Sequence, residues 1–142
     1  MQYLGSVKKL YISKINQREK VDTITCDEFG ILDDKFYNKD KNRSILLSSL
    51  QSYELAKQNN INLDYGLLGE NILLDFDPHK LSIGSVISIG EVKLQISQEC
   101  TLCKHLNTID NKLATLLKND RGIFAYALND GEIKLNDKVY IN

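Results

Sequence analysis

The chain alternates apolar and polar residues over many short stretches, a pattern typical of half-buried β-strands. The clearest alternation runs from Leu81 to Ile96, and Gly90-Glu91 within it suits a two-residue type II′ hairpin turn. Shorter segments of the same kind lie at 5–14, 21–25, 45–47, 72–74, 122–128, 133–135 and 139–141. Turn signals such as Asn129-Asp130-Gly131 separate them. We therefore predict a chain built from many short strands.

Two segments have helical periodicity instead. Ser48 and Gln51 form a capping-box pattern, which predicts a helix over 50–57 that ends at Asn59-Asn60. A later segment places four apolar residues on one helical face and ends near Asn119; they are Ile109, Leu113, Leu116 and Leu117. We expect this apolar face to pack against the sheet.

This combination predicts a mainly β (α+β) fold, an antiparallel-rich β-barrel with two or three short helices. A doubly wound α/β sheet would need more helices than the pattern provides. With 142 residues, the chain suits a single domain, 1–142, long enough to bury its own core.

The charge of the chain and the composition of its segments argue against nucleic-acid-binding, secreted and membrane-spanning proteins. The formal net charge is −1 and the sequence pI is about 6.1, and no basic block occurs, so nucleic acid is not an expected partner. The first residues lack the pattern of a signal peptide, and no apolar run reaches the roughly 18 residues of a membrane span. We therefore expect a cytoplasmic protein without a membrane partner, whose three cysteines are reduced thiols.

The main candidate for chemistry follows the alternating stretch, at Cys100-Thr101-Leu102-Cys103-Lys104-His105. A thiolate is both a nucleophile and a soft metal ligand, and neighbouring cations lower the pKa of a thiol. Lys104 and His105 beside Cys103 therefore suit a reactive cysteine. In contrast, Cys26 is followed by Asp27 and Glu28, whose charges disfavour a thiolate, so we expect it to be less reactive.

Other interpretations of the cysteines remain open at this stage. Single cysteines are often buried as small apolar residues. A zinc half-site would need further ligands, for which the chain offers His105 and the distant Cys26 or His79. A thioredoxin-like site is disfavoured, because the single proline, Pro78, precedes the motif rather than following it.

Several short motifs follow one another along the chain. They are Gly30 with Asp34-Lys35-Phe36, Arg43 before the strand at 45–47, Gly66-x-x-Gly69-Glu70-Asn71, the hairpin beginning at Ile83-Gly84, Cys103, Arg121-Gly122-x-Phe124-Ala125, Gly131-x-Ile133 and Asp137-x-Val139. In this order and spacing the chain resembles the MOSC family, named for the C-terminal domain of molybdenum cofactor sulfurases, over nearly its whole length. The resemblance implies a MOSC-type β-barrel.

The chain departs from the family pattern at several turns. Asp33 stands where the family has glycine, Ser85 and Asn136 replace members of Gly-Asp pairs, and Leu102 replaces a proline before the cysteine. Lys35 replaces an arginine, which keeps the charge but loses the fork that matches a phosphate. The two glycines Gly66 and Gly69 are retained and predict backbone that bends or approaches another group closely.

The resemblance implies a molybdenum-pterin cofactor, or sulfur carried on one cysteine, with Cys103 as molybdenum ligand or persulfide carrier. Lys35, Arg43 and Arg121 would contact the cofactor's phosphate. Glu70 and Asn71 would either orient the ligand or bridge loops around it.

The partner implied by the resemblance is the cofactor itself, or a molybdoenzyme or sulfur-donor protein; the oligomeric state stays open. Two alternatives accompany this function. One is a non-catalytic binding module whose cysteines are structural or hold zinc, and zinc is the less favoured metal because too few ligands are available. The other, also implied by the family, is a molybdenum-dependent reductase of N-hydroxylated compounds.

Overall fold

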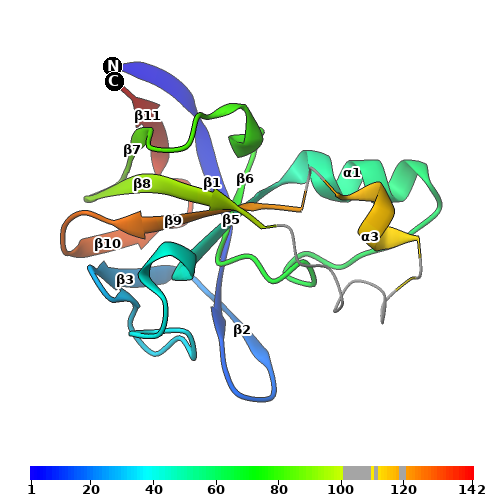
Figure 1. Ribbon diagram of the computed structural model, residues 1–142, viewed down its shortest axis with the longest axis horizontal. Helices are drawn as coiled ribbons and strands as arrows, with labels where there is room; N and C mark the ends of the chain where they lie inside the picture. The colour runs from blue at the N-terminus through cyan, green and yellow to red at the C-terminus, as the bar shows by residue number, and fades with distance from the viewer. Residues whose placement is uncertain (101–109, 111, 119–120) are drawn as a thin grey trace.

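Seven strands form a closed ring in the structure, a computed structural model that describes residues 1–100, 110, 112–118 and 121–142 (Figure 1). The strand order is β11-β7-β8-β9-β5-β6-β1, and pairing between β11 and β1 closes the ring. In chain order these strands are β1 (Gln2–Ser13), β5 (Ile45–Ser49), β6 (Ile72–Leu74), β7 (Val86–Ile89), β8 (Val92–Glu99), β9 (Ile123–Ala127) and β11 (Lys138–Ile141). The predicted barrel is therefore confirmed.

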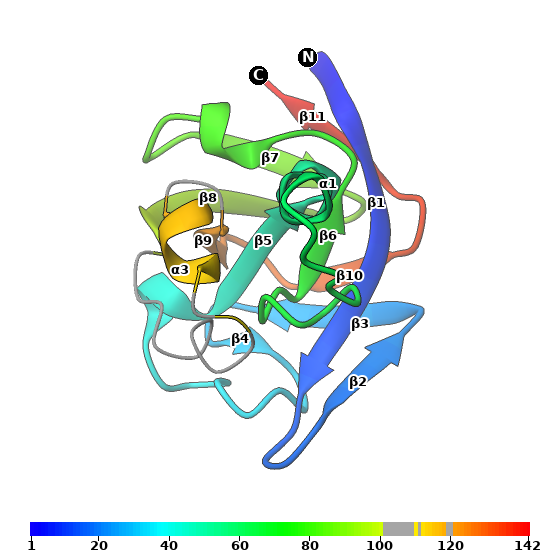
Figure 2. The same ribbon diagram turned by 90° about the vertical axis from the view of Figure 1, so that its right-hand side faces the viewer.

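Three further strand pairings complete the described β-structure. β2 (Arg18–Val21) pairs with the end of β1 outside the ring, and β3 (Thr23–Asp27) forms a second sheet with β10 (Gly131–Lys134) and β4 (Gly30–Ile31). Every described pairing is antiparallel except that between β5 and β6, which is parallel. Since β1 pairs with β11 along 2–6, both termini lie at one end of the barrel (Figure 2).

The barrel encloses the main hydrophobic core. Along the β7–β8 hairpin, Ile87, Ile89, Leu94 and Ile96 point inward and are at most 1% exposed, as the alternation predicts. Gly90 connects the two strands with φ +56, the left-handed value that the hairpin turn requires. Cys26 lies in this same core.

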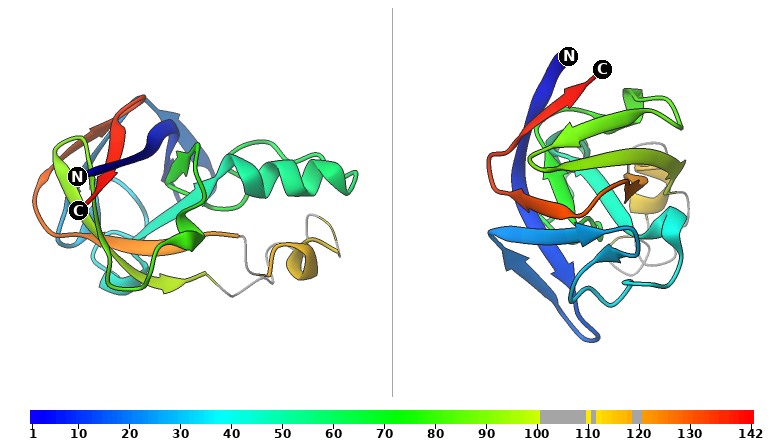
Figure 3. Two further views of the ribbon diagram at one scale, coloured as in Figure 1. Left: turned by 90° about the horizontal axis from the view of Figure 1, so that it is seen from above. Right: turned by 90° about the vertical axis from the view of Figure 1, so that its left-hand side faces the viewer.

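Two helices, α1 (Leu50–Gln58) and α3 (Leu113–Leu116), lie side by side on one side of the barrel (Figures 1 and 3). Leu113 and Leu117 are fully buried, in a second cluster with Tyr53 and Ala56 of α1. The same cluster contains Leu73 of β6, so the expected packing against the sheet is found in part, together with packing against α1. Ile109, which was predicted on the same face, lies outside the described residues. Among the described residues, no helix has the length and apolarity needed to cross a membrane.

Two turn positions explain how the chain departs from the family pattern without losing its geometry. Asp33 and Asn136 have φ values of +72 and +69, in the left-handed region that glycine adopts at little cost. Asp and Asn are the side chains that tolerate this region best. The replacements therefore preserve the turns. Gly66 and Gly69 also have positive φ, +95 and +89, which confirms the predicted bend.

Candidate functional site

One pocket of about 870 Å³ opens where several separate segments meet. Its walls come from the β1–β2 hairpin, the loop after β4, the 3₁₀ turn η1 (Lys41–Arg43) with the start of β5, the loop before β6, and the ends of β8 and β9. A pocket of this size can hold a drug-sized organic ligand. Among the five residues that the resemblance implies for cofactor binding, four line it: Lys35, Arg43, Asn71 and Arg121.

The pocket is strongly basic. Among the described residues, one acidic residue, Asp40, lines it together with six basic ones, which are Lys14, Arg18, Lys35, Lys39, Arg43 and Arg121. In the part of the chain that the structure describes, no carboxylate lies within 4.0 Å of the charged groups of Lys35, Lys39 or Arg43. Because the whole chain carries a net charge of −1, the positive charge is concentrated at this site.

Lys35 and Arg43 are exposed and rest on aromatic rings rather than on acids. The guanidinium carbon of Arg43 lies 5.1 Å from the centre of the Phe124 ring, and Lys35 Nζ lies 5.1 Å from the centre of the Phe36 ring. Such stacking holds a cation in place without neutralising its charge. Both side chains can therefore offer hydrogen-bond donors to an anion in the pocket.

Asp34 positions this side of the pocket and was not predicted as a site residue. It is 5% exposed; its Oδ1 accepts the backbone N–H of Ser13 at 2.6 Å, and its Oδ2 accepts that of Phe36 at 3.0 Å. The N–H of Lys35 donates to the Ser13 carbonyl at 2.8 Å. These bonds fasten the loop after β4 to the end of β1 and so fix the backbone that carries Lys35.

Asn71 joins three elements through its amide. Its Oδ1 accepts the N–H of Leu46 at 2.9 Å, and its Nδ2 donates to the Tyr11 carbonyl and to Asp34 Oδ1, each at 3.2 Å. An asparagine amide has two N–H donors, so both are occupied here. Asn71 therefore bridges loops around the pocket, the second of the two roles considered for it, and keeps one acceptor lone pair at most for a ligand.

Glu70 points away from the pocket. Its carboxyl is fully buried and lies 2.8 and 2.6 Å from the Tyr53 hydroxyl, while the N–H of Gly66 donates to Oε2 at 3.2 Å. Burial raises the pKa of Glu70, an effect that the Tyr53 hydrogen bond opposes. The carboxyl thus anchors the loop at 66–69, which forms one pocket wall, to helix α1.

Arg18 lines the pocket from the β1–β2 hairpin and was also not predicted from the sequence. Its guanidinium donates to Ser13 Oγ and to the Glu70 carbonyl, and it lies 5.6 Å from the centre of the Tyr11 ring. Burial lowers the pKa of Arg18, and the charge of Glu70 opposes this shift. Arg18 therefore ties the β1–β2 hairpin to the loop before β6. No local pattern marks this role, because it depends on how the hairpin folds.

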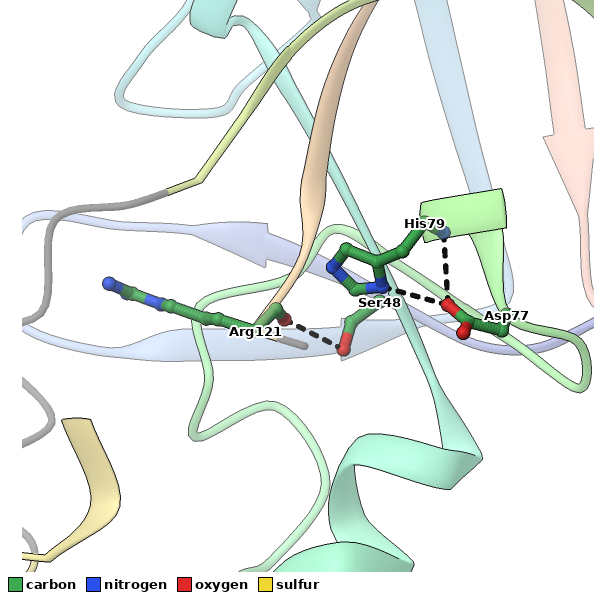
Figure 4. A network of polar contacts seen from close by, with 4 residues as sticks. All are labelled: Ser48, Asp77, His79 and Arg121. Carbon is green, nitrogen blue, oxygen red and sulfur yellow. Dashed lines mark hydrogen bonds and ion pairs between the residues drawn. The ribbon is translucent and has the colours of Figure 1, made fainter. Parts of the chain in front are cut away.

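Arg121 enters the pocket from the start of β9, where its Nε donates to the Leu68 carbonyl at 3.2 Å. The Arg121 carbonyl accepts a hydrogen bond of 3.2 Å from Ser48 Oγ, and His79 Nδ1 lies 2.8 Å from Asp77 Oδ1 nearby. Figure 4 shows the Arg121 side chain extending away from Ser48 and His79. Ser48 is fully buried, and neither it nor His79 lines the pocket. The Ser48 hydrogen bond therefore supports the backbone of Arg121, and the Asp77–His79 pair is separate from it.

The cysteines occupy different environments. Cys100 is 5% exposed, packs with Leu46 and Phe124, and lines the pocket. Cys26 is buried in the barrel, and burial raises the pKa of its thiol to about 12. Cys103 and His105 lie outside the described residues, so the molybdenum-ligand and persulfide roles of Cys103 stay predictions. Among the residues that the structure describes, no three His, Cys, Asp or Glu side chains gather in a metal-binding arrangement.

A comparison with protein-family models decides the family. The model of the MOSC domain matches residues 34–140, most of the chain. The chain belongs to the MOSC domain family. The matched region begins at Asp34 and includes all the residues that the resemblance implied for the site.

Solved structures share this fold. The YUAD protein from Bacillus subtilis superposes with a TM-score of 0.81 at 18% identity, over 95% of this chain and 93% of that one. YiiM from Escherichia coli gives a TM-score of 0.68 at 20% identity, over 100% of this MOSC chain and 70% of its own. YiiM from Geobacillus stearothermophilus gives 0.69 at 14% identity, over 99% and 74%. At these identities the similarity concerns the fold alone. No curated protein sequence matches the chain significantly.

Proposed function

We propose that this MOSC domain binds a molybdenum-pterin cofactor in the basic pocket, with Cys103 as metal ligand or persulfide carrier. The observation that carries the proposal is a pocket of about 870 Å³ whose described lining contains six basic residues and a single acid. Guanidinium and ammonium groups are the partners that a phosphate prefers. The site therefore suits an organic anion better than a neutral ligand.

The pocket also suits the remainder of such a ligand. Leu46, Leu67, Phe36 and Phe124 supply apolar and aromatic wall, and flat ring systems are commonly bound between such side chains. When bound, the metal would supply a redox-active centre. The chain's own residues would bind and orient: Arg43 and Lys35 would hold the phosphate, while Asp34 and Asn71 keep the backbone of these walls in place.

The thiol has a separate function in this proposal. A thiolate can ligate a high-valent metal, or it can accept sulfane sulfur from a donor and become a persulfide. The strand β8 runs directly into Cys100 at the pocket wall, three residues before Cys103 in the sequence. This chain connectivity, together with the family match, supports Cys103 as the residue that meets the ligand.

The decisive test is the composition of the full chain isolated from its own host under anaerobic, non-reducing conditions. We expect molybdenum with pterin fluorescence, or a cysteine peptide heavier by the mass of one sulfur atom, about 32 Da. Cys103→Ser should abolish the retained species, whereas Cys100→Ser should keep most of it. Zinc at one per chain without pterin would contradict the proposal and favour a binding module. Equal loss in both variants would contradict the single-cysteine mechanism and restore a Cys-x-x-Cys site.

Arg43→Ala tests the anion contact independently of the thiol. Because Arg43 is exposed and has no carboxylate partner within 4.0 Å among the described residues, the thermal midpoint should stay nearly unchanged. Calorimetric binding of inorganic phosphate or pyrophosphate should weaken by about 1–3 kcal/mol, the range for hydrogen bonds to charged groups. Lys138→Ala, which removes an exposed cation outside the pocket, is the matched control. A large fall in midpoint with unchanged binding would assign Arg43 to the fold.

A further inference from the structure

Three exposed apolar side chains surround the mouth of the pocket. Ile15, Phe36 and Leu67 are 84%, 48% and 38% exposed, and all three line the pocket. They come from three separate segments: the β1–β2 hairpin, the loop after β4 and the loop before β6. Exposed apolar residues scattered singly need no explanation, but a group rimmed by polar residues marks an interaction site.

Ile15 is the most prominent of the three. It lies in the connection of the β1–β2 hairpin, where the N–H of Lys14 donates to the Gln17 carbonyl at 2.7 Å. The hairpin extends beyond the other strands of the barrel (Figures 1 and 2). Ile15 belongs to no hydrophobic cluster of the described residues and is left exposed by them.

The positive charge of the basic residues around the mouth, the pocket rim, exceeds the negative charge of one phosphate group. Lys35, Lys39 and Arg43 are exposed and lack a carboxylate partner within 4.0 Å in the described part of the chain. A single phosphate group carries about two negative charges at most. A phosphate group would therefore balance only part of the charge of the six basic residues that line the pocket, even with Asp40 in the lining. This charge balance rests on the proposed function, because it assumes a bound phosphate. The exposure of Ile15, Phe36 and Leu67 is independent of it.

We propose that the pocket rim is a docking surface for an acidic protein that covers the mouth, with Ile15 inserted into an apolar hollow of that partner. Charge complementarity selects the acidic surface, since among the described residues that line the pocket Asp40 is the one acid against six basic side chains. Ile15, Phe36 and Leu67 come from three separate segments around the opening of the pocket, so a protein surface can follow their outline, whereas a flat lipid surface would span it. The observations therefore favour a protein over a membrane.

The test compares capture by the full-length wild type with capture by Ile15→Asp and by Ile83→Asp. Ile83 is 57% exposed but does not line the pocket, so it is the matched control. Each immobilised protein is exposed to soluble extract of its own host, and retained proteins are identified by mass spectrometry, then purified and titrated. We expect an acidic protein whose affinity falls at least about tenfold with Ile15→Asp and with Lys39→Glu. Its affinity should change less than about twofold with Ile83→Asp and should fall as salt rises from about 50 to about 300 mM.

Two results would overturn the proposal. The first is that every protein retained by the wild type is retained equally by Ile15→Asp, with circular dichroism showing that the variant is folded. The second is that vesicles containing phosphatidylglycerol bind the wild type but not Ile15→Asp, which would assign the rim to a membrane surface. Partner capture is measured separately from metal and pterin content, so this proposal and the proposed function can fail independently.

Discussion

Asn71→Ala should be among the most destabilising single substitutions at the pocket. Truncation removes the acceptor of the Leu46 N–H and the donor to the Tyr11 carbonyl, and it takes one hydrogen bond from Asp34. A buried polar group left without a partner costs about 1–3 kcal/mol, so two backbone groups would cost about 2–6 kcal/mol. Because Asn71 also lines the pocket, water can replace part of the amide, and we expect a loss of about 2–4 kcal/mol.

The assay is urea unfolding followed by far-ultraviolet circular dichroism and tyrosine fluorescence, since the chain has seven Tyr and no Trp. The denaturation midpoint should fall with little change in the m-value, because the surface exposed on unfolding is the same. Each kcal/mol should lower Tm by about 2–4 °C in a chain of this length. Asn62→Ala, at an exposed position, should stay within about 0.5 kcal/mol of the wild type.

Asn71→Asp separates lost hydrogen bonds from lost volume. The substitution keeps an acceptor for Leu46 but places a second carboxylate oxygen 3.2 Å from Asp34 Oδ1, where the amide nitrogen lies in the wild type. Like charges this close disfavour ionisation of both groups. The variant should therefore be at least as unstable as Asn71→Ala at neutral pH and should recover on acidification. Unfolding free energies within about 0.5 kcal/mol of the wild type for both variants would refute the reasoning.

Two further predictions concern buried ionisable groups. Iodoacetamide at about pH 8 should label Cys103 and leave Cys26 unmodified in the folded protein, because burial raises the pKa of Cys26 to about 12. Urea-unfolded protein, in which both cysteines are accessible, is the control. Equal labelling of both cysteines in the folded protein would contradict this prediction. The pKa of Glu70 is raised by burial, so its contribution to stability is present at low pH and is lost as the pH rises through the raised pKa. Glu70→Gln should therefore gain stability relative to the wild type as the pH rises from about 4 to about 8. A difference in unfolding free energy between the two proteins that stays constant across that range would show that the carboxyl does not titrate there.

The strands could be predicted from the sequence because each buries one face. Alternation along Leu81 to Ile96 places Ile87, Ile89, Leu94 and Ile96 inside the barrel, and a shift of one residue in the pairing would turn all four outward. The positive φ of Gly90 follows from the same local pattern. Local periodicity and turn chemistry were therefore sufficient for the class of fold.

The helix start shows where local patterns fail. Ser48 and Gln51 match a capping box, but that prediction was wrong: the N-cap is Ser49, which makes no side-chain capping hydrogen bond. Ser48 remains in strand β5, and its hydroxyl donates to the Arg121 carbonyl 73 residues later in the chain. A tertiary hydrogen bond to a distant strand therefore takes the hydroxyl that the local pattern assigns to the helix.

The site was predicted only where a motif marks it. Lys35, Arg43 and Arg121 belong to the family pattern and do line the pocket. Arg18 belongs to no motif, and it reaches the pocket because the β1–β2 hairpin folds beside the loop before β6, where the Glu70 carbonyl accepts its hydrogen bond. Such contacts between distant segments follow from the folded topology, which no single stretch of sequence records.

The positions and hydrogen-bond partners of the carboxylates explain how a chain of net charge −1 can present a positive pocket. Asp34 and Glu70 lie close to the site, but their carboxyl oxygens accept backbone N–H groups of Ser13, Phe36 and Gly66. Peptide N–H groups therefore occupy oxygens of both carboxyls. Burial also raises the pKa of Glu70, which disfavours its charged form, and Arg18 offsets this effect only in part. Acids on distant faces contribute little, because charges separated by more than about 8 Å are largely screened at physiological salt. The positive potential at the mouth thus follows from where the carboxylates find their partners, and the total charge of the sequence does not reveal it.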